Sequence, residues 1–291
     1  MNERIARRPR LAPFLALLLA ALLSACAAPL QEIAAPAEVQ AGPDREGFSV
    51  QYVATSRRAG ARQPFLLLRP EHPVASVILF TGGSGVAGVS PQGVSKPGNF
   101  LIRTRRQFVR QGLMVAVVDP PSDRRSLDGF RTSAAHALDM KGVIAFLREQ
   151  APVPVWLVGT SYGSVSAAKV ADRLADGGGP DGVVLTSSVF RANRTLGDSV
   201  LDADPARLRV PLLIVHHRND RCWATPFADA EPYRLRMSHA RPSELIAFEG
   251  GGPVRGDVCE PYDHHGYVGL EEQVVAAIAR WIKEHPPRTR G

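Results

Sequence analysis

The sequence has few cysteines and lacks the patterns of several protein classes. Its 291 residues include three cysteines, too few for a cysteine-ligated metal cluster. Basic residues outnumber acidic ones and give a formal net charge of +7, but they are dispersed and form no basic block with interleaved aromatic residues. A nucleic-acid-binding surface would need such a block, so the basic balance gives no support to a nucleic-acid partner. What remains is a chain with 45% apolar residues, enough for a sizeable globular core.

The apolar run at the N-terminus is too short to span a bilayer. Residues 11–23 form a run of 13 residues that is interrupted only by Pro13. A transmembrane helix needs about 20 such residues, whereas a run of this length after a basic segment is typical of a signal peptide. The basic segment is present as residues 4–10.

The end of this run resembles a bacterial lipobox. Leu23-Ser24-Ala25 leads directly into Cys26. In such signals the cysteine is lipidated and becomes the first residue of the mature chain. We therefore predict a signal peptide over residues 1–25 and lipidation of Cys26, with a plain secretory signal as the alternative. Ala27 stands where an Asp would indicate retention in the inner membrane, so the resemblance implies export and a lipid anchor in the outer membrane, facing the periplasm.

Two further regions follow the signal peptide. Residues 26–45 are rich in Ala and Pro without periodicity, which predicts a flexible tether. Residues 46–291 alternate short apolar strands with helical segments, which predicts an α/β domain. The expected strands are residues 48–53, 64–68, 74–80, 113–118, 153–158, 182–186, 210–216 and 244–248, and the expected helices are residues 99–111, 133–150, 164–171, 225–236 and 269–283. This alternation predicts a mostly parallel central sheet flanked by helices on both faces, with antiparallel strands only at the start.

A Gly-x-Ser-x-Gly motif interrupts the transition from one strand to the next helix. Residues 159–163 read Gly-Thr-Ser-Tyr-Gly, directly after an apolar strand and before a segment of helical composition. This context predicts a nucleophile elbow with Ser161 at its apex. Gly159 and Gly163 would relieve the crowding between strand and helix because they have no Cβ.

The order and spacing of three chemical groups resemble the α/β-hydrolase family over residues 46–286. In that family the nucleophile is followed by an acid and then a histidine. Asp220 follows an apolar strand and is the predicted acid; Asp202 and Asp204 precede that strand and fit less well. The base is predicted to be His265, which a Gly and a Tyr follow, with His264 as the alternative. The family's oxyanion hole would use the N–H groups of Tyr162 and of Gly82 or Gly83, although Thr81 stands where many esterases have His.

Three other expectations follow from this reading. His216 and His217 should lie near Asp220, and Cys222 and Cys259 should form a disulfide in an exported protein, with two free thiols as the alternative. The connection over residues 187–210 is short, so a small lid or none is expected. Nothing in the sequence indicates a metal, nucleotide or flavin cofactor.

The resemblance implies a lipid-anchored serine hydrolase that cleaves a small-molecule ester or thioester through an acyl-enzyme intermediate. One alternative is a peptidase or amidase of the same fold. The other is a catalytically silent member that serves as a binding lipoprotein of the cell envelope.

Overall fold

The computed structural model describes residues 47–55, 58–192 and 197–286. The predicted signal peptide, the lipidation site at Cys26 and the tether over residues 26–45 lie outside the described residues. Within the described part, no helix is both long enough and apolar enough to cross a membrane.

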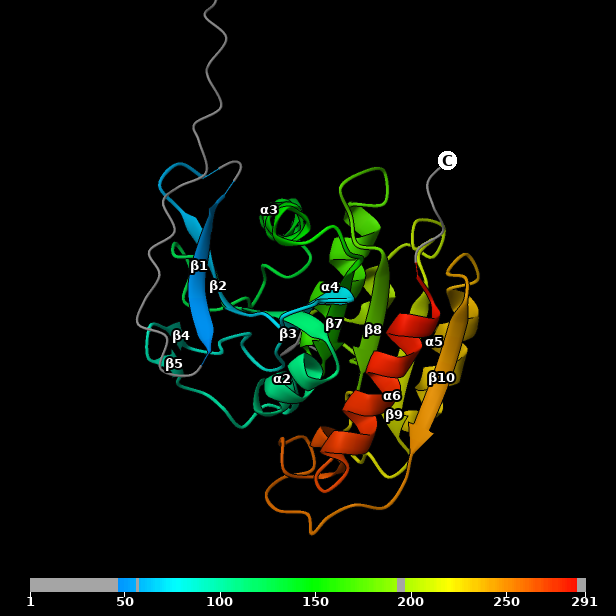
Figure 1. Cartoon of the computed structure of the whole chain (residues 1–291). Helices are drawn as coiled ribbons and strands as arrows, with labels where there is room; N and C mark the ends of the chain where they lie inside the picture. The colour runs from blue at the N-terminus through cyan, green and yellow to red at the C-terminus, as the bar shows by residue number, and fades with distance from the viewer. Residues whose placement is uncertain (1–46, 56–57, 193–196, 287–291) are drawn as a thin grey trace, which may run out of the picture. The chain divides into compact units, whose positions relative to one another are not determined.

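One eight-stranded sheet forms the centre of the domain (Figure 1). Its strands lie in the order β1 (Phe48–Ala54), β2 (Arg62–Leu68), β6 (Leu113–Val118), β3 (Ala75–Phe80), β7 (Val155–Thr160), β8 (Gly182–Thr186), β9 (Leu212–His217) and β10 (Ser243–Phe248). β1 pairs antiparallel with β2, and β2 with β6, whereas every pair from β6 to β10 is parallel. The predicted mostly parallel sheet, with its antiparallel strands at the start, is confirmed.

The central strands are buried along their whole length, and are mostly apolar, because both faces of the sheet are covered. Every residue of β3, β6, β7, β8 and β9 is buried. Alternate side chains enter two separate cores: Val155 and Leu157 of β7 pack on one side, and Trp156 and Val158 pack on the other. Continuous apolar strands of this kind are typical of parallel sheets between two helical layers.

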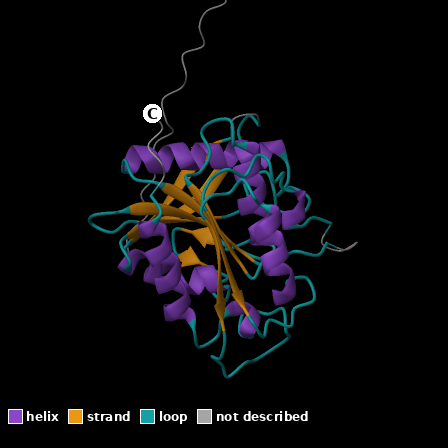
Figure 2. Cartoon of the chain, turned by 90° about the vertical axis from the view of Figure 1, so that its right-hand side faces the viewer, coloured by secondary structure: helices purple, strands orange, loops and turns teal. Residues whose placement is uncertain are grey.

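Within the described residues, five α-helices supply these two layers. α3 (Ala134–Gln150), α4 (Gly163–Arg173) and α5 (Ala230–Arg236) pack against the core that contains Leu157. α2 (Phe100–Arg110) and α6 (Glu271–Glu284) pack against the core that contains Trp156. Figure 2 shows helices on both sides of the twisted sheet, as predicted.

Several short elements differ from the sequence-based expectation. α5 begins at Ala230 rather than at residue 225, because Thr225 closes a turn onto the Cys222 carbonyl and residues 227–229 form a 3₁₀ turn, η2 (Phe227–Asp229). A two-stranded hairpin, β4 (Val89–Ser90) with β5 (Gly93–Val94), is too short to show periodicity in sequence. The described residues between β8 and β9 contain one 3₁₀ turn, η1 (Val200–Asp202), which agrees with a small lid or none.

Candidate active site

Ser161 occupies a sharp turn between β7 and α4. Its backbone has φ +52°, a left-handed conformation that is strained for a residue with a side chain. The two flanking glycines permit the close approach of strand and helix. A Cβ on Gly159 would lie 2.5 Å from the Gly163 carbonyl oxygen, and one on Gly163 would lie 2.1 Å from the Phe80 carbonyl oxygen. The predicted elbow geometry is therefore present.

Asp220 and His265 meet at the same edge of the sheet. Asp220 follows β9, and His265 lies in a 3₁₀ turn, η3 (His264–Gly266), in the loop after β10. His265 Nδ1 is 3.0 Å from Asp220 Oδ2, and both side chains are almost fully buried. Because the carboxyl ends of parallel strands share one edge, β7, β9 and β10 bring all three predicted groups there.

The Asp220 carboxylate accepts further hydrogen bonds that fix its orientation. Oδ1 accepts from the Cys222 N–H at 2.9 Å, and Oδ2 accepts from the Thr225 hydroxyl at 2.9 Å. His216, which is fully buried, places Nε2 3.5 Å from Oδ2. Burial alone would raise the pKa of Asp220, but the neighbouring His216 and His265 imidazoles hold it well below its usual range. The carboxylate is thus ionised at neutral pH and holds the His265 Nδ1 proton.

His264, the alternative base, faces a different environment. Its ring stacks on that of His217, with centroids 4.3 Å apart and planes 17° apart. His217 accepts from the Asn219 N–H at Nδ1 and contacts the Gly250 carbonyl at Nε2, so its ring is held on both sides. Burial lowers the pKa of His217 below its ordinary value. The geometry therefore favours His265, whose Nδ1 is the one that meets Asp220.

Two buried residues, whose contacts the sequence analysis did not predict, hold the His265 loop. The Ser187 hydroxyl donates to the His265 carbonyl at 2.8 Å. Tyr267 donates its hydroxyl to the Val215 carbonyl at 2.8 Å and accepts from the Ser187 N–H at 3.0 Å. The sequence analysis also did not predict the contact of the Thr225 hydroxyl with Asp220. These residues lack a sequence signature, since a Ser, Thr or Tyr after a strand has many ordinary roles.

The loop after β3 lies directly against Ser161. A Cβ on Gly82 would lie 2.9 Å from the Ser161 Cβ, so only glycine allows this approach. Gly83 has φ +55°, and the Gly85 N–H closes a turn onto the Gly82 carbonyl. In the described structure neither Gly82 nor Gly83 donates its N–H to a protein acceptor.

A pocket of about 360 Å³ opens at this edge. Ser161, His265, Thr81, Gly82 and Gly83 line it together, and its wall is completed by Phe100, Pro261 and the rim residues Lys96 and Glu260. A reacting group in this pocket would contact Ser161, His265 and the Gly82–Gly83 loop together.

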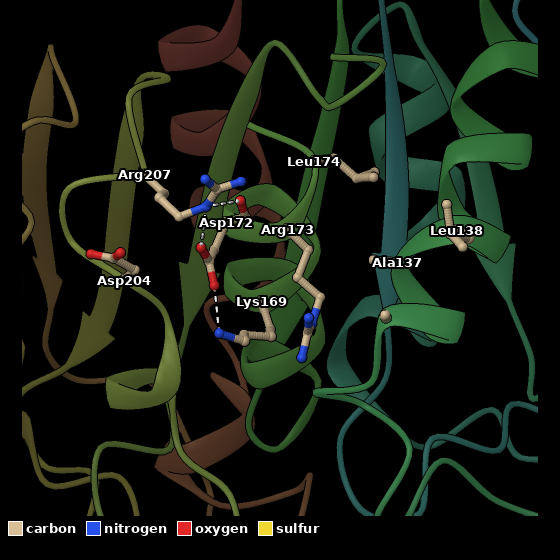
Figure 3. Close-up of a pocket in the computed structure, with 9 residues that line it drawn as sticks. Ala137, Leu138, Lys169, Asp172, Arg173, Leu174, Asp204 and Arg207 are labelled. Carbon is tan, nitrogen blue, oxygen red and sulfur yellow. Dashed lines mark hydrogen bonds and ion pairs between the residues drawn. The ribbon is translucent and has the colours of Figure 1, made fainter. Parts of the chain in front are cut away.

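A larger pocket, of about 460 Å³, contains none of these residues (Figure 3). Two of its cations share one carboxylate: Asp172 pairs with both Lys169 and Arg207, as the dashed lines show. Asp204 also lines it, and its carboxylate accepts from the Ala206 N–H. Asp202 caps η1 by accepting from the Ser199 N–H. Neither of these two alternative acids approaches His265 in a contact of the described structure.

A disulfide joins the loops that carry the acid and the histidine. Cys222 lies two residues after Asp220 and is bonded to Cys259, which is one of the residues lining the Ser161 pocket. The predicted bridge is present. Within the described residues, no group of three or more His, Cys, Asp or Glu side chains is placed to hold a metal ion.

Solved structures of low sequence identity share this architecture. A cold-adapted esterase from an Arctic intertidal metagenomic library has a TM-score of 0.55 at 16% identity, with 82% of this chain and 95% of that chain covered. A Pyrococcus furiosus esterase has a TM-score of 0.58 at 12% identity, with 82% of this chain and 91% of that chain covered. An α/β serine hydrolase without a lid from Xanthomonas campestris has a TM-score of 0.52 at 15% identity, with 78% of this chain and 91% of that chain covered.

No protein-family model matches the sequence, and no curated protein matches it. At such identities the structural likeness establishes the fold and leaves the activity to be argued from the site. The chain therefore has the α/β-hydrolase fold, with a mostly parallel sheet between two helical layers.

Proposed function

We propose that this protein is a serine hydrolase that cleaves an ester or thioester, with Ser161 as nucleophile, His265 as base and Asp220 as acid. The observation that carries the proposal is the 3.0 Å contact between His265 Nδ1 and Asp220 Oδ2. The His265 side chain lines the same pocket as Ser161. The esterases and serine hydrolases of similar fold support the same class of reaction.

The geometry suits acyl transfer in two halves. Ser161 Oγ attacks the substrate carbonyl carbon while its proton passes to His265 Nε2. The carbonyl π electrons move to the oxygen, and the N–H groups of Tyr162 and of Gly82 or Gly83 stabilise that oxyanion. Collapse breaks the bond to the leaving alkoxide or thiolate, which takes the proton from His265. Water then attacks the acyl-enzyme by the same steps, releasing the acid and restoring Ser161.

Asp220 contributes charge and orientation rather than a proton. Its low pKa keeps it ionised, so it stabilises the imidazolium that forms on His265 in both halves. Thr225 and the Cys222 N–H keep the carboxylate in place during this change of charge.

A fluorophosphonate probe tests the proposal. We expect wild-type protein to be phosphonylated at Ser161, with loss of fluoride, and Ser161→Ala to be unlabelled. A panel of esters, thioesters and amides graded by acyl length then identifies the preferred bond. Folded wild-type protein that neither reacts with the probe nor turns over any member of the panel would instead support a silent binding protein. Amide cleavage at rates above ester cleavage would assign it as an amidase.

We also propose that the domain is exported and anchored through lipid on Cys26. The Leu23-Ser24-Ala25-Cys26 motif after an apolar run supports this, and a disulfide is the chemistry of an oxidising compartment. Cys26→Ser should move the protein from the membrane fraction to the soluble fraction or leave an uncleaved precursor. Mass spectrometry of the wild-type N-terminus provides the check, since an unlipidated mature start elsewhere would refute the anchor.

A further inference from the structure

Arg131 is a buried cation beneath the candidate site that the acyl-transfer steps above do not use. It is 1% exposed and lies in the segment between β6 and α3. Within the described residues no carboxylate forms an ion pair with it; Asp128 and Asp198 act only through longer-range attraction. Its Nε is buried without a hydrogen-bond partner.

Such a group destabilises the folded state unless its contacts offset the cost of burying the charge. Moving a cation out of water costs several kcal/mol, and an ion pair or full hydrogen bonding normally offsets that cost. Burial lowers the pKa of Arg131 to about 10, so the guanidinium remains charged at neutral pH. An incompletely satisfied buried charge therefore requires an explanation in terms of what it contacts.

Its contacts reach both halves of the predicted oxyanion hole. Nη2 donates to the Gly83 carbonyl at 2.7 Å, in the loop that follows β3. The guanidinium carbon lies 4.7 Å from the centroid of the Tyr162 ring, and Tyr162 carries the other predicted N–H donor. Nη1 donates to the Ser166 hydroxyl at 3.0 Å, which fixes the guanidinium to α4.

The loop is shaped to admit this side chain. Gly85 has φ +81°, a conformation that favours glycine, and an added Cβ would lie 2.9 Å from Arg131 Nη2 and 2.7 Å from Leu127 Cδ1. Gly83 lines the pocket, whereas Arg131 does not. The guanidinium thus holds the loop from the side away from the substrate.

We propose that Arg131 is a positioning residue of the oxyanion hole, one that sets the Gly82–Gly83 donors and Tyr162 relative to each other and places a positive charge behind the developing oxyanion. Buried charges act strongly on neighbouring charge because the protein interior screens them weakly. This inference rests on the proposed serine hydrolase function.

Three variants separate this role from simple stabilisation. Arg131→Met keeps the volume of the side chain without charge or donors, and Arg131→Lys keeps the charge with different geometry. The matched control is Arg58→Met. Arg58 lies 5.1 Å from the ring of Phe130, the neighbour of Arg131, and pairs with Asp139 and Asp123, but has no contact with Gly83 or Tyr162.

Two measurements are made on each folded variant. The first is kcat and KM on an activated short-chain ester. The second is the inhibition constant of an aryl trifluoromethyl ketone, whose carbonyl carbon bonds to Ser161 Oγ and leaves an oxyanion in the hole. For Arg131→Met we expect kcat to fall about 10- to 100-fold with KM within about threefold, since loss of a whole donor costs about 10²–10³. The ketone's affinity should fall by the same factor. Arg58→Met should lower thermal stability and leave both quantities within about threefold.

Arg131→Lys keeps the test decisive if Arg131→Met does not fold. We expect a smaller loss of kcat at neutral pH, together with an alkaline decline of kcat that begins at a lower pH than in the wild type, whose Arg131 has a pKa of about 10. The reason is that burial lowers a lysine pKa from its ordinary value of about 10.4, so the charge is lost within the measured range.

The proposal is overturned if folded Arg131→Met retains kcat and ketone affinity within about threefold of the wild type. It is also overturned if kcat falls while ketone affinity is unchanged, or if Arg131→Lys shows the wild-type pH profile. These results differ from failure of the proposed function, in which wild-type protein would show neither ester turnover nor fluorophosphonate labelling.

Discussion

His264 and His265 are neighbours in sequence, yet their side chains have different partners. His265 Nδ1 meets Asp220, whereas His264 stacks on the ring of His217. We therefore predict that His265→Ala lowers kcat by about 10³-fold or more, because it removes the group that accepts and returns the proton. His264→Ala should lower kcat by less than about tenfold. Steady-state kinetics of the two variants on one activated ester would measure both.

Ser161→Ala and the double variant Ser161→Ala/His265→Ala complete this comparison. Residues that act as one unit lose activity non-additively, so the double variant should resemble either single one. An inactive His264→Ala beside an active His265→Ala would place the base one residue earlier.

At this scale, the sequence was informative where a residue type has few alternative roles. A serine in Gly-x-Ser-x-Gly and a histidine pair before the last helix stand out against their surroundings. Arg131, Thr225 and Ser187 do not, because each is a common residue in a loop or at a strand end. Their roles depend on contacts between segments far apart in sequence, such as Ser187 with His265. Periodicity carries no information about such contacts.

At the scale of elements, the passage from β7 into α4 depends on the absence of side-chain atoms. A Cβ on Gly163 would lie 2.1 Å from the Phe80 carbonyl oxygen of β3, a backbone atom that cannot rotate away. We predict that Gly163→Ala destabilises the fold by about 3 kcal/mol or more, at the upper end of the cost of overpacking. Urea unfolding followed by circular dichroism would measure the free energy.

Gly177→Ala is the matched control for this prediction. Gly177 follows the same helix, has no atom within 4 Å of an added Cβ and has a negative φ. Its replacement should change the unfolding free energy by less than about 0.5 kcal/mol. Equal unfolding free energies of the two variants would contradict the prediction. They would mean that α4 can move away from the Phe80 carbonyl without a loss of stability.

The central strands were predictable because each is a short, mostly apolar run with clear ends, and the long helices because their segments have helical composition between turn residues. The short elements were not. The β4–β5 hairpin has two residues in each strand, below the length at which alternation can be seen. The segment before α5 has helical composition, but Thr225 is turned toward Asp220 and its turn onto Cys222 delays the helix. Here tertiary contacts outweigh local preference.

At the scale of the whole molecule, the disulfide links two parts of the site that are distant along the chain. Cys222 and Cys259 are 37 residues apart, and the segment between them contains η2, α5 and β10. Closing a loop of this length stabilises the fold by about 4 kcal/mol in the chain-entropy treatment. For a domain of this size, that corresponds to a fall in Tm of about 10 °C when the bridge is removed.

We predict that the double variant Cys222→Ala/Cys259→Ala has this lower Tm and also a lower kcat. The Cys222 N–H that binds Asp220 is a backbone group and persists in the variant, so any loss of kcat reports movement of the two loops. Calorimetry and ester kinetics on the variant, with oxidised wild type as reference, provide both values. Treating the wild type with reductant should reproduce the shift, while the variant should not respond to it. Two free thiols in the native protein, or an unchanged Tm in the variant, would show that the bridge does not hold the site together.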